Sequence, residues 1–371
     1  MYLYIHIPFC ASKCIYCDFY SKTNTQDIED YLTCLKREIG LRSNRSDQLD
    51  TIYLGGGTPS LLSPKQLGGI FDCLNSSFDL SSLKEVTIEM NPDDVTNEYL
   101  DGIASLPINR ISMGVQSWYD DDLKFLRRRH TSDRAMSAVK MCQDKGYSRL
   151  SLDLIYGLPN QTIERWKHNI MTTLDLDPGH ISAYHLIYEE GTPLNNLRLK
   201  GRVSPIDEEL SLEQFELLIS LMSDGGYEQY EISNFAKNEA YAIHNTSYWL
   251  GLPYMGFGPA AHSYDGIDCR RSNYSDLRRY IDCLLEGQDA PHDNEYLTQV
   301  NRHDEMIMCS LRTKWGLDLS RYESLFGRRA EILRQSQSFI DQHLLQVRND
   351  HLILTRKGIF LSDGIMSELF L

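Results

Sequence analysis

The sequence IPFCASKCIYCDF, residues 7–19, contains three cysteines in a CxxxCxxC spacing and follows directly on a predicted strand, Tyr2–Ile7. Three thiolates on one short loop can hold three irons of a cubane cluster and leave the fourth iron without a protein ligand. A structural zinc site with His6 as fourth ligand is an alternative, but structural zinc more often uses two separated pairs of ligands. The spacing therefore favours a 4Fe-4S cluster with an open iron, held by Cys10, Cys14 and Cys17.

The composition excludes several classes of protein. The chain has 371 residues, 42% hydrophobic and 24% charged, which is typical of a globular protein of about two domains. Its formal net charge of -15 argues against nucleic-acid partners, since phosphate backbones attract basic surfaces. No apolar run is long enough for a membrane helix and no signal peptide is recognised, so a cytoplasmic location is expected. The six cysteines outside the loop are expected to be small core residues.

Short β-branched runs alternate with amphipathic helical stretches in the first half of the chain. This alternation predicts a parallel sheet, and we expect its strands to be apolar at consecutive positions. The chemistry of such a sheet lies at the carboxyl ends of its strands. The predicted strands are Tyr2–Ile7, Thr51–Leu54, Glu85–Glu89, Arg110–Val115, Ser151–Ile155 and His180–Leu186, and the predicted helices are Gln26–Leu41, Pro64–Leu74, Glu98–Ser105, Asp133–Lys145 and Ile163–Leu174.

The rest of the chain is organised differently. A helix is expected over Asp207–Ser223, and the Tyr- and Gly-rich stretch Tyr227–Tyr264 shows little periodicity. From residue 301, three helices, a hairpin of Leu344–Val347 with His351–Leu354, and a final helix resemble a winged-helix module. We therefore expect a barrel core over 1–200, a substrate-facing extension over 201–300, and a mainly helical docking or lid domain over 301–371.

Glycines and polar residues occur at the ends of several predicted strands. Gly55-Gly56-Gly57-Thr58 follows the second strand, where the absence of a Cβ lets the backbone approach a ligand. Glu89, Gln116 and Asp153 are polar residues on otherwise apolar strands, and a buried polar group needs a partner such as a bound cofactor. Taken alone, the glycine run also fits an ordinary loop, and Glu89 also fits a salt-bridged residue at the rim of the sheet.

The cysteine loop and its flanks, YIHIPFC and YCDF, resemble the oxygen-independent coproporphyrinogen oxidase branch of the radical S-adenosylmethionine (SAM) superfamily, over nearly the whole chain. The resemblance implies an α/β fold with a partial (β/α)6 TIM-like barrel, and a fourth iron that is chelated by SAM. Arg128 would pair with the carboxylate of this cofactor, since a guanidinium can bind it bidentately. The implied SAM contacts are Tyr4, Tyr16, Gly56, Gly57, Thr58, Glu89, Gln116, Arg128 and Asp153.

Three features point to the haem-chaperone members of this branch rather than to the dehydrogenase. Phe19 stands where the dehydrogenase has a further cysteine, and Cys10 lies only nine residues from Met1, without the dehydrogenase's N-terminal extension. The segment His244–Trp249 matches the HNxxYW motif of the chaperones. A neutral imidazole can ligate haem iron, and nearby aromatic rings offer flat apolar surface. The implied haem residues are His244, Asn245, Tyr248 and Trp249.

The resemblance implies a cytoplasmic haem chaperone that binds a 4Fe-4S cluster, SAM and haem. It would deliver haem to respiratory or other cytochrome-type proteins, some of them at the membrane, and a homodimer is compatible with this role. Oxidative decarboxylation of coproporphyrinogen III is the alternative function, and productive SAM cleavage is left open because an enzyme would need the same binding residues. Ala242 stands where some relatives have a cysteine, so the second axial ligand is undetermined, with His262 as an alternative.

Overall fold

Six parallel strands form the centre of the fold, and they are hydrogen-bonded to one another in the order in which they occur in the sequence. The structure is a computed structural model that describes residues 1–371. All six predicted strands are confirmed, with ends shifted by one or two residues. They are β1 (Tyr2–Ile7), β2 (Thr51–Gly56), β3 (Glu85–Met90), β4 (Arg110–Gln116), β5 (Leu150–Tyr156) and β6 (His180–His185).

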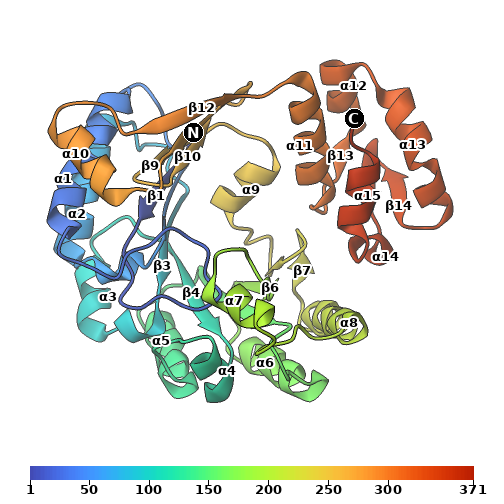
Figure 1. Ribbon diagram of the computed structural model, residues 1–371, viewed down its shortest axis with the longest axis horizontal. Coiled ribbons are helices and arrows are strands. Elements are labelled where there is room, and N and C mark those ends of the chain that lie inside the picture. Colours follow the sequence, from blue (N-terminus) through green and yellow to red (C-terminus); the bar gives the residue numbers. More distant parts are fainter.

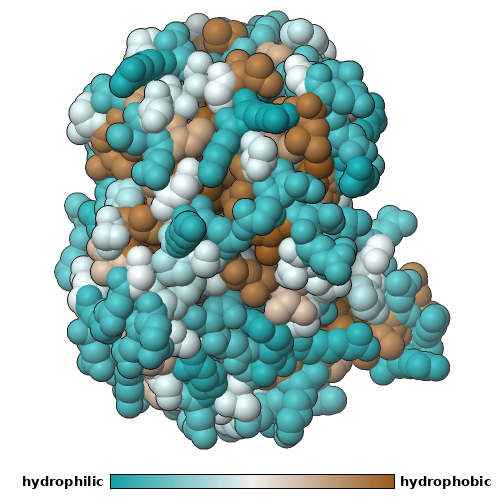
Figure 2. All heavy atoms as spheres, turned by 90° about the vertical axis from the view of Figure 1, so that its left-hand side faces the viewer, coloured by the Kyte–Doolittle hydropathy of each residue, from teal (hydrophilic) through white to brown (hydrophobic).

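Helices connect these strands and cover the outer face of the sheet (Figure 1). They are α1 (Ile28–Arg42), α2 (Pro64–Ser77), α3 (Asn97–Ile103), α4 (Asp120–Phe125), α5 (Ser132–Asp144) and α6 (Ile163–Asp175), of which the sequence did not indicate α4. Local sequence explains their starts: Pro64 begins α2, where Ser63 and Gln66 form a capping box. Polar side chains cover most of the face that carries α1 and α2, with hydrophobic ones between them (Figure 2).

The strands alternate between apolar and polar residues, so the expectation of consecutive apolar positions is wrong. On β2, Ile52 and Leu54 are fully buried in the core beneath the helices, whereas Thr51 and Tyr53 bond to side chains on the inner face. The other strands repeat this pattern, which is typical of a sheet whose two faces meet different surroundings. The inner-face residues of the next strands are Glu85, Thr87, Glu89, Arg110, Ser112, Ser151, Asp153, His180 and Ser182.

Residues 201–300 extend this sheet at both edges instead of forming a sheet of their own. Antiparallel strands β8 (Asn234–Ala236) and β7 (Glu228–Gln229) follow β6, after α7 (Pro193–Leu199) and α8 (Glu208–Asp224). At the other edge, β9 (Tyr254–Phe257) runs parallel to β1 and is followed by β10 (His262–Tyr264), β11 (Cys269–Asn273) and β12 (His292–Tyr296). The sheet has 12 strands and stays open, with β12 and β7 at its ends.

Two further helices of this segment occupy different sides of the sheet. Helix α10 (Leu277–Leu285) packs against α1 on the outer face, whereas α9 (Ile243–Trp249) lies on the inner side, between the sheet and the C-terminal helices (Figure 1). The HNxxYW motif is therefore a short helix, in a stretch where the sequence predicted little regular structure.

The C-terminal residues form a small domain with a hydrophobic core of its own. Its elements are α11 (Gln299–Leu311), β13 (Leu317–Asp318), α12 (Leu319–Phe326), α13 (Arg329–Asp341), β14 (Leu345–Arg348), β15 (His351–Leu354), α14 (Arg356–Ile359) and α15 (Ser362–Glu368). The hairpin lies beside the short strand β13, in the order β13-β15-β14, which confirms the winged-helix-like prediction. Across the whole chain, no helix combines the length and the apolar character that crossing a bilayer would require.

Candidate functional site

The cysteine loop is held at both ends and in its middle. The backbone N–H of Cys10 donates to the Lys22 carbonyl at 2.9 Å, and the N–H of Lys22 donates to the Pro8 carbonyl at 2.8 Å, which closes the loop at its base. Between the second and third cysteine, Ile15 is 2% exposed and packs with Leu126 in a separate apolar cluster. The loop is thereby fixed while its cysteines face a cavity.

This cavity, of about 60 Å³, lies between the cysteine loop and the strand ends, and we refer to it as the small cavity. Thr58 Oγ1 lies 3.5 Å from Cys10 Sγ, and the Arg128 guanidinium donates to Cys14 Sγ at 3.4 Å and to the Gly114 carbonyl at 2.8 Å. Arg128 Nε is buried without a hydrogen-bond partner. The residues that line the small cavity are Cys10, Ser12, Lys13, Cys14, Tyr16, Cys17, Ser21, Gly57, Thr58, Asn91, Arg128 and Arg129.

The donor set fits a sulfide-rich cluster better than a single zinc ion. Nowhere in the chain do three or more His, Cys, Asp or Glu side chains converge to hold one metal ion. His6 is not free to be the fourth ligand, because its Nδ1 lies 3.0 Å from the Tyr4 hydroxyl and its Nε2 lies 2.8 Å from the Tyr20 carbonyl. Three cysteines lining one cavity, together with the unpaired cationic nitrogen of Arg128, suit an anionic cluster and a carboxylate-bearing ligand.

The glycine run packs closely against the start of the cysteine loop, which leaves no room for a larger residue at Gly57. A Cβ on Gly57 would lie 2.5 Å from the Phe9 carbonyl oxygen, and Gly56 adopts a φ of +103° that disfavours other residues. The N–H of Gly57 donates to Ile7 at 2.8 Å and that of Thr58 donates to Phe9 at 2.7 Å. The run therefore extends β2 past its last predicted residue and bonds it to the start of the cysteine loop.

The predicted carboxylates meet on the inner face, beside the glycine run. Glu89 accepts a hydrogen bond from the Tyr53 hydroxyl at 2.8 Å and from the Gly56 N–H at 3.1 Å. Asp153 accepts from the Ser112 hydroxyl at 3.2 Å. Burial raises the pKa of Glu89 to about 7 and that of Asp153 to about 6, so both carboxyl groups bind protons more readily than usual.

Gln116 is a strained residue at the end of β4. It has a φ of 72° although it is not a glycine, it is 8% exposed, and the register between β4 and β5 shifts at this point. Such a conformation costs free energy and is common at ligand sites. Arg127 has a φ of 57°, next to the predicted cofactor arginine. Strain therefore occurs at the end of β4 and next to Arg128, which lines the small cavity.

The structure brings together only part of the predicted SAM set. Tyr16, Gly57, Thr58 and Arg128 line the small cavity, whereas Tyr4 faces a second, larger cavity. Asn91 also lines the small cavity, and sequence reasoning missed it although it directly follows the third strand. Its position behind a strand end, like that of Glu89, was a usable signal.

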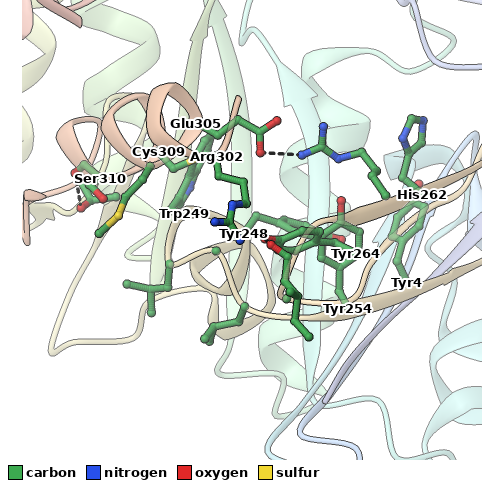
Figure 3. A pocket seen from close by; sticks show the side chains of 18 of the residues that line it. Tyr4, Tyr248, Trp249, Tyr254, His262, Tyr264, Arg302, Glu305, Cys309 and Ser310 are labelled. Carbon is green, nitrogen blue, oxygen red and sulfur yellow. Dashed lines mark hydrogen bonds and ion pairs between the residues drawn. The ribbon is translucent and has the colours of Figure 1, made fainter. Parts of the chain in front are cut away.

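The second cavity, the large cavity, has a volume of about 1440 Å³ and lies between the inner side of the sheet and the C-terminal domain. One wall comes from β1, α9, β9 and β10, and the other comes from α11 and α12. Aromatic side chains line both walls, and Figure 3 shows five of the first wall, Tyr4, Tyr248, Trp249, Tyr254 and Tyr264. The aromatic residues that line the large cavity are Tyr4, Phe19, Tyr20, Tyr248, Trp249, Tyr254, Tyr264, Trp315 and Phe326.

His244 is enclosed beside this cavity and does not line it. Its side chain has 1% exposure, with Nδ1 at 2.7 Å from Thr51 Oγ1 and Nε2 at 2.8 Å from the Tyr248 hydroxyl. The Glu85 carboxylate accepts from the backbone N–H groups of Ile243 and His244, both at 3.0 Å, and so fixes the start of α9. Burial lowers the pKa of His244 to about 3, so the imidazole is neutral at pH 7.

Of the predicted haem residues, Tyr248 and Trp249 line the large cavity, whereas His244 and Asn245 do not. His262 lines it as well, with Nδ1 at 3.1 Å from the Ser272 hydroxyl. The C-terminal residues in the wall were missed, among them Arg302, Glu305, Cys309 and Trp315. No local pattern marks them, because only the fold brings α11 next to α9.

Comparison with known proteins agrees with this arrangement. The model of the radical SAM superfamily matches residues 4–171, and that of the HemN C-terminal domain matches residues 297–361. Heme chaperone HemW of Bacillus subtilis is 35% identical, with 98% of this chain and 97% of the relative covered. The mitochondrial radical S-adenosyl methionine domain-containing protein 1 of Danio rerio is 34% identical, with 100% and 86% covered.

A solved structure shows the same fold. Coproporphyrinogen III oxidase (HemN) from Escherichia coli, a radical SAM enzyme, superposes with a TM-score of 0.84 over 100% of this chain and 89% of its own, at 24% identity. Several curated HemW proteins share 31–35% identity over nearly their whole length, among them that of Mycobacterium tuberculosis at 31%. The chain therefore belongs to the radical SAM superfamily and, within it, to the HemW family.

Proposed function

We propose that this protein is a haem chaperone, which binds haem and passes it to cytochrome-type acceptor proteins. The observation that supports this function most directly is the large cavity, whose aromatic walls include Tyr248 and Trp249 of the HNxxYW helix. A wide apolar cavity with flat rings suits a planar macrocycle. The curated relatives that match the full chain at 31–35% identity are named heme chaperones, whereas the similarity to the oxidase HemN shows the fold alone.

The cluster would lie at the small cavity, and its cofactor would extend from there along the inner face of the strands. Cys10, Cys14 and Cys17 would ligate a 4Fe-4S cluster, and Arg128 would pair with the carboxylate of SAM. Glu89 would accept hydrogen bonds from the ribose, in place of the one from the Tyr53 hydroxyl. When bound, such a cluster would supply electron-transfer chemistry next to SAM. In a chaperone, binding of the cluster and SAM would mainly change the conformation or the oligomeric state of the protein.

His244 is the proposed haem ligand, and Tyr248 controls access to it. The imidazole is neutral, as iron ligation requires, but its Nε2 is bonded to the Tyr248 hydroxyl. The Tyr248 ring lines the large cavity, so a rotation of this ring would both release Nε2 and make room for the macrocycle. His244 would then bind iron from the wall of the cavity.

An anaerobic haem titration tests the proposal. Wild type, His244→Ala and His168→Ala, each with its cluster reconstituted, would be followed by the Soret band. His168 is an exposed histidine of α6 outside the cavity, so its removal controls for adventitious binding. We expect one haem per chain in wild type and in the control, and loss of the site in His244→Ala.

Two other outcomes change the conclusion. If wild type binds no haem, the chaperone function is wrong, and coproporphyrinogen III becomes the substrate to test. If His244→Ala binds as tightly as wild type, the chaperone function stands but the iron ligand is another side chain of the cavity. His262→Ala would then be measured next, followed by transfer of haem to an apo-cytochrome.

A further inference from the structure

The C-terminal wall of the large cavity contains an arginine that the rest of the protein does not use. Arg302 extends from α11 into the cavity (Figure 3), and its guanidinium makes no hydrogen bond or ion pair anywhere in the structure. Its neighbour on the same helix, Glu305, is bonded instead to Arg270 at 2.8 Å. A side chain with several N–H donors is therefore left without an acceptor inside the cavity.

The two other arginines of the cavity are already partnered, and the remaining cation, Lys13, is an exposed residue of the cysteine loop. Arg270 pairs with Glu305 and, at 3.4 Å, with Glu295, and the Arg321 guanidinium donates to the Leu250 carbonyl at 3.3 Å. A second unpaired donor lies in the opposite wall, because Trp249 Nε1 on α9 is buried without a hydrogen-bond partner. Two unsatisfied donors, one from each wall of the cavity, point to an anionic ligand group between the walls.

The chemistry of the cavity defines the ligand class. Aromatic rings from both walls suit a flat apolar ring system, and an unpaired guanidinium suits a carboxylate, which it can bind through two parallel hydrogen bonds. We propose that Arg302 anchors a carboxylate of a planar macrocyclic ligand in the large cavity. The inference deepens the proposed function, since haem has two propionates. It assigns recognition of the ligand's acid groups to the C-terminal domain.

Porphyrins with free and with esterified acid groups test this assignment. Protoporphyrin IX and its dimethyl ester would be titrated by fluorescence into wild type, Arg302→Gln and Arg334→Gln. Arg334 is an exposed arginine of α13 outside the cavity and serves as the matched control. Both probes lack iron, so ligation by a histidine does not enter the comparison.

We expect Arg302→Gln to weaken binding of the free acid about 10- to 100-fold, the usual range for a lost charged hydrogen bond. Binding of the diester should stay within about twofold of wild type, and Arg302→Lys should restore part of the loss because it restores the charge. Arg334→Gln should bind both probes as wild type does. Arg302 bonds to no other group, so the variant is expected to fold normally.

The assignment is wrong if Arg302→Gln weakens the acid and the diester equally, which indicates a structural role, or if it weakens neither. It is also wrong if wild type binds neither porphyrin. The carboxylate anchor and the proposed chaperone function can fail independently of each other. Suppose that the protein binds protoporphyrin IX through Arg302, but binds haem no more tightly than this porphyrin and does not transfer it. The carboxylate anchor would then stand, and the chaperone function would be wrong.

Discussion

The two cavities of this protein are built in opposite ways. The small cavity, of about 60 Å³, is fixed by backbone hydrogen bonds and by glycines with no room for a Cβ. The large cavity, of about 1440 Å³, is formed by side chains of two separate parts of the chain. A tight polar site suits a group that stays bound, whereas a wide aromatic site with unpaired donors suits a ligand that must leave again.

The largest expected effect is the loss of the cluster. Cys14→Ala should abolish the reconstituted 4Fe-4S cluster, because Cys14 is one of three thiols in the small cavity and Arg128 bonds to it. Iron and acid-labile sulfide analysis measures this. Cys73→Ala is the control, since Cys73 is a partly buried cysteine of the outer helix α2. If the cavities are independent, haem binding by Cys14→Ala should stay within about threefold of wild type.

A matched pair of glycine variants sharpens the contrast in rigidity. Gly57→Ala should reduce the free energy of unfolding by roughly 1–3 kcal/mol and impair cluster assembly, because its Cβ would meet the Phe9 backbone at 2.5 Å and displace the cysteine loop. Gly40→Ala lies within helix α1 with nothing within 4 Å, and should stabilise the protein by roughly 0.5–1 kcal/mol. Urea denaturation measures both; equal effects of the two changes would contradict the rigid small cavity.

A smaller effect is expected in the large cavity. Tyr248→Phe removes the hydroxyl that occupies His244 Nε2 and should raise haem affinity about fivefold, since one such bond contributes about 1 kcal/mol. Tyr254→Phe alters a neighbouring ring of the same cavity, with a centroid 4.7 Å from that of Tyr248, and should have little effect. Stopped-flow and equilibrium haem titrations distinguish them. Unchanged or weaker binding by Tyr248→Phe would show that Tyr248 does not block the ligand.

The inner-face carboxylates should contribute to the pH dependence of stability. The pKa values of Glu89 and Asp153 are raised by burial to about 7 and about 6, so the folded cofactor-free protein keeps protons that the unfolded chain has released. Their contribution to stability is present at low pH and is lost as the pH rises through these values. In urea denaturation, the free energy of unfolding of the double variant Glu89→Gln with Asp153→Asn should therefore rise relative to that of wild type as the pH increases from 5 to 7.5. The exposed pair Glu213→Gln with Asp144→Asn should show a difference from wild type that does not change with pH.

The sequence predicted the central sheet and the cysteine loop because their signals are local. Each strand of β1 to β6 is a short segment with apolar residues at alternate positions, and CxxxCxxC is contiguous. The alternation of Thr51, Ile52, Tyr53 and Leu54 was equally visible and was overlooked, although it already indicates a polar inner face. The glycine run and the strand-end carboxylates were found for the same reason, since they directly follow strands.

What could not be predicted depends on contacts between distant segments. Strands β7 to β10 have two to four residues each, too few for a periodic signal, and their order at the sheet edges is set by pairing with β6 and β1. Arg302 follows His244 by some 58 residues and reaches the same region only because α11 packs against α9. The enclosure of His244 by Thr51 and Tyr248 is likewise a property of the fold, although its motif was recognised.

The positions of the lining residues also fix an order in time during synthesis on the ribosome. The small cavity is lined by residues that end at Arg129, whereas the large cavity needs residues as late as His351. At roughly 5–20 residues per second, the intervening segment of some 220 residues takes about 10 to 40 seconds to emerge. Every wall residue of the cluster site is thus translated well before the cargo site can form, and a growing chain cannot take up cargo before its cluster loop has been made.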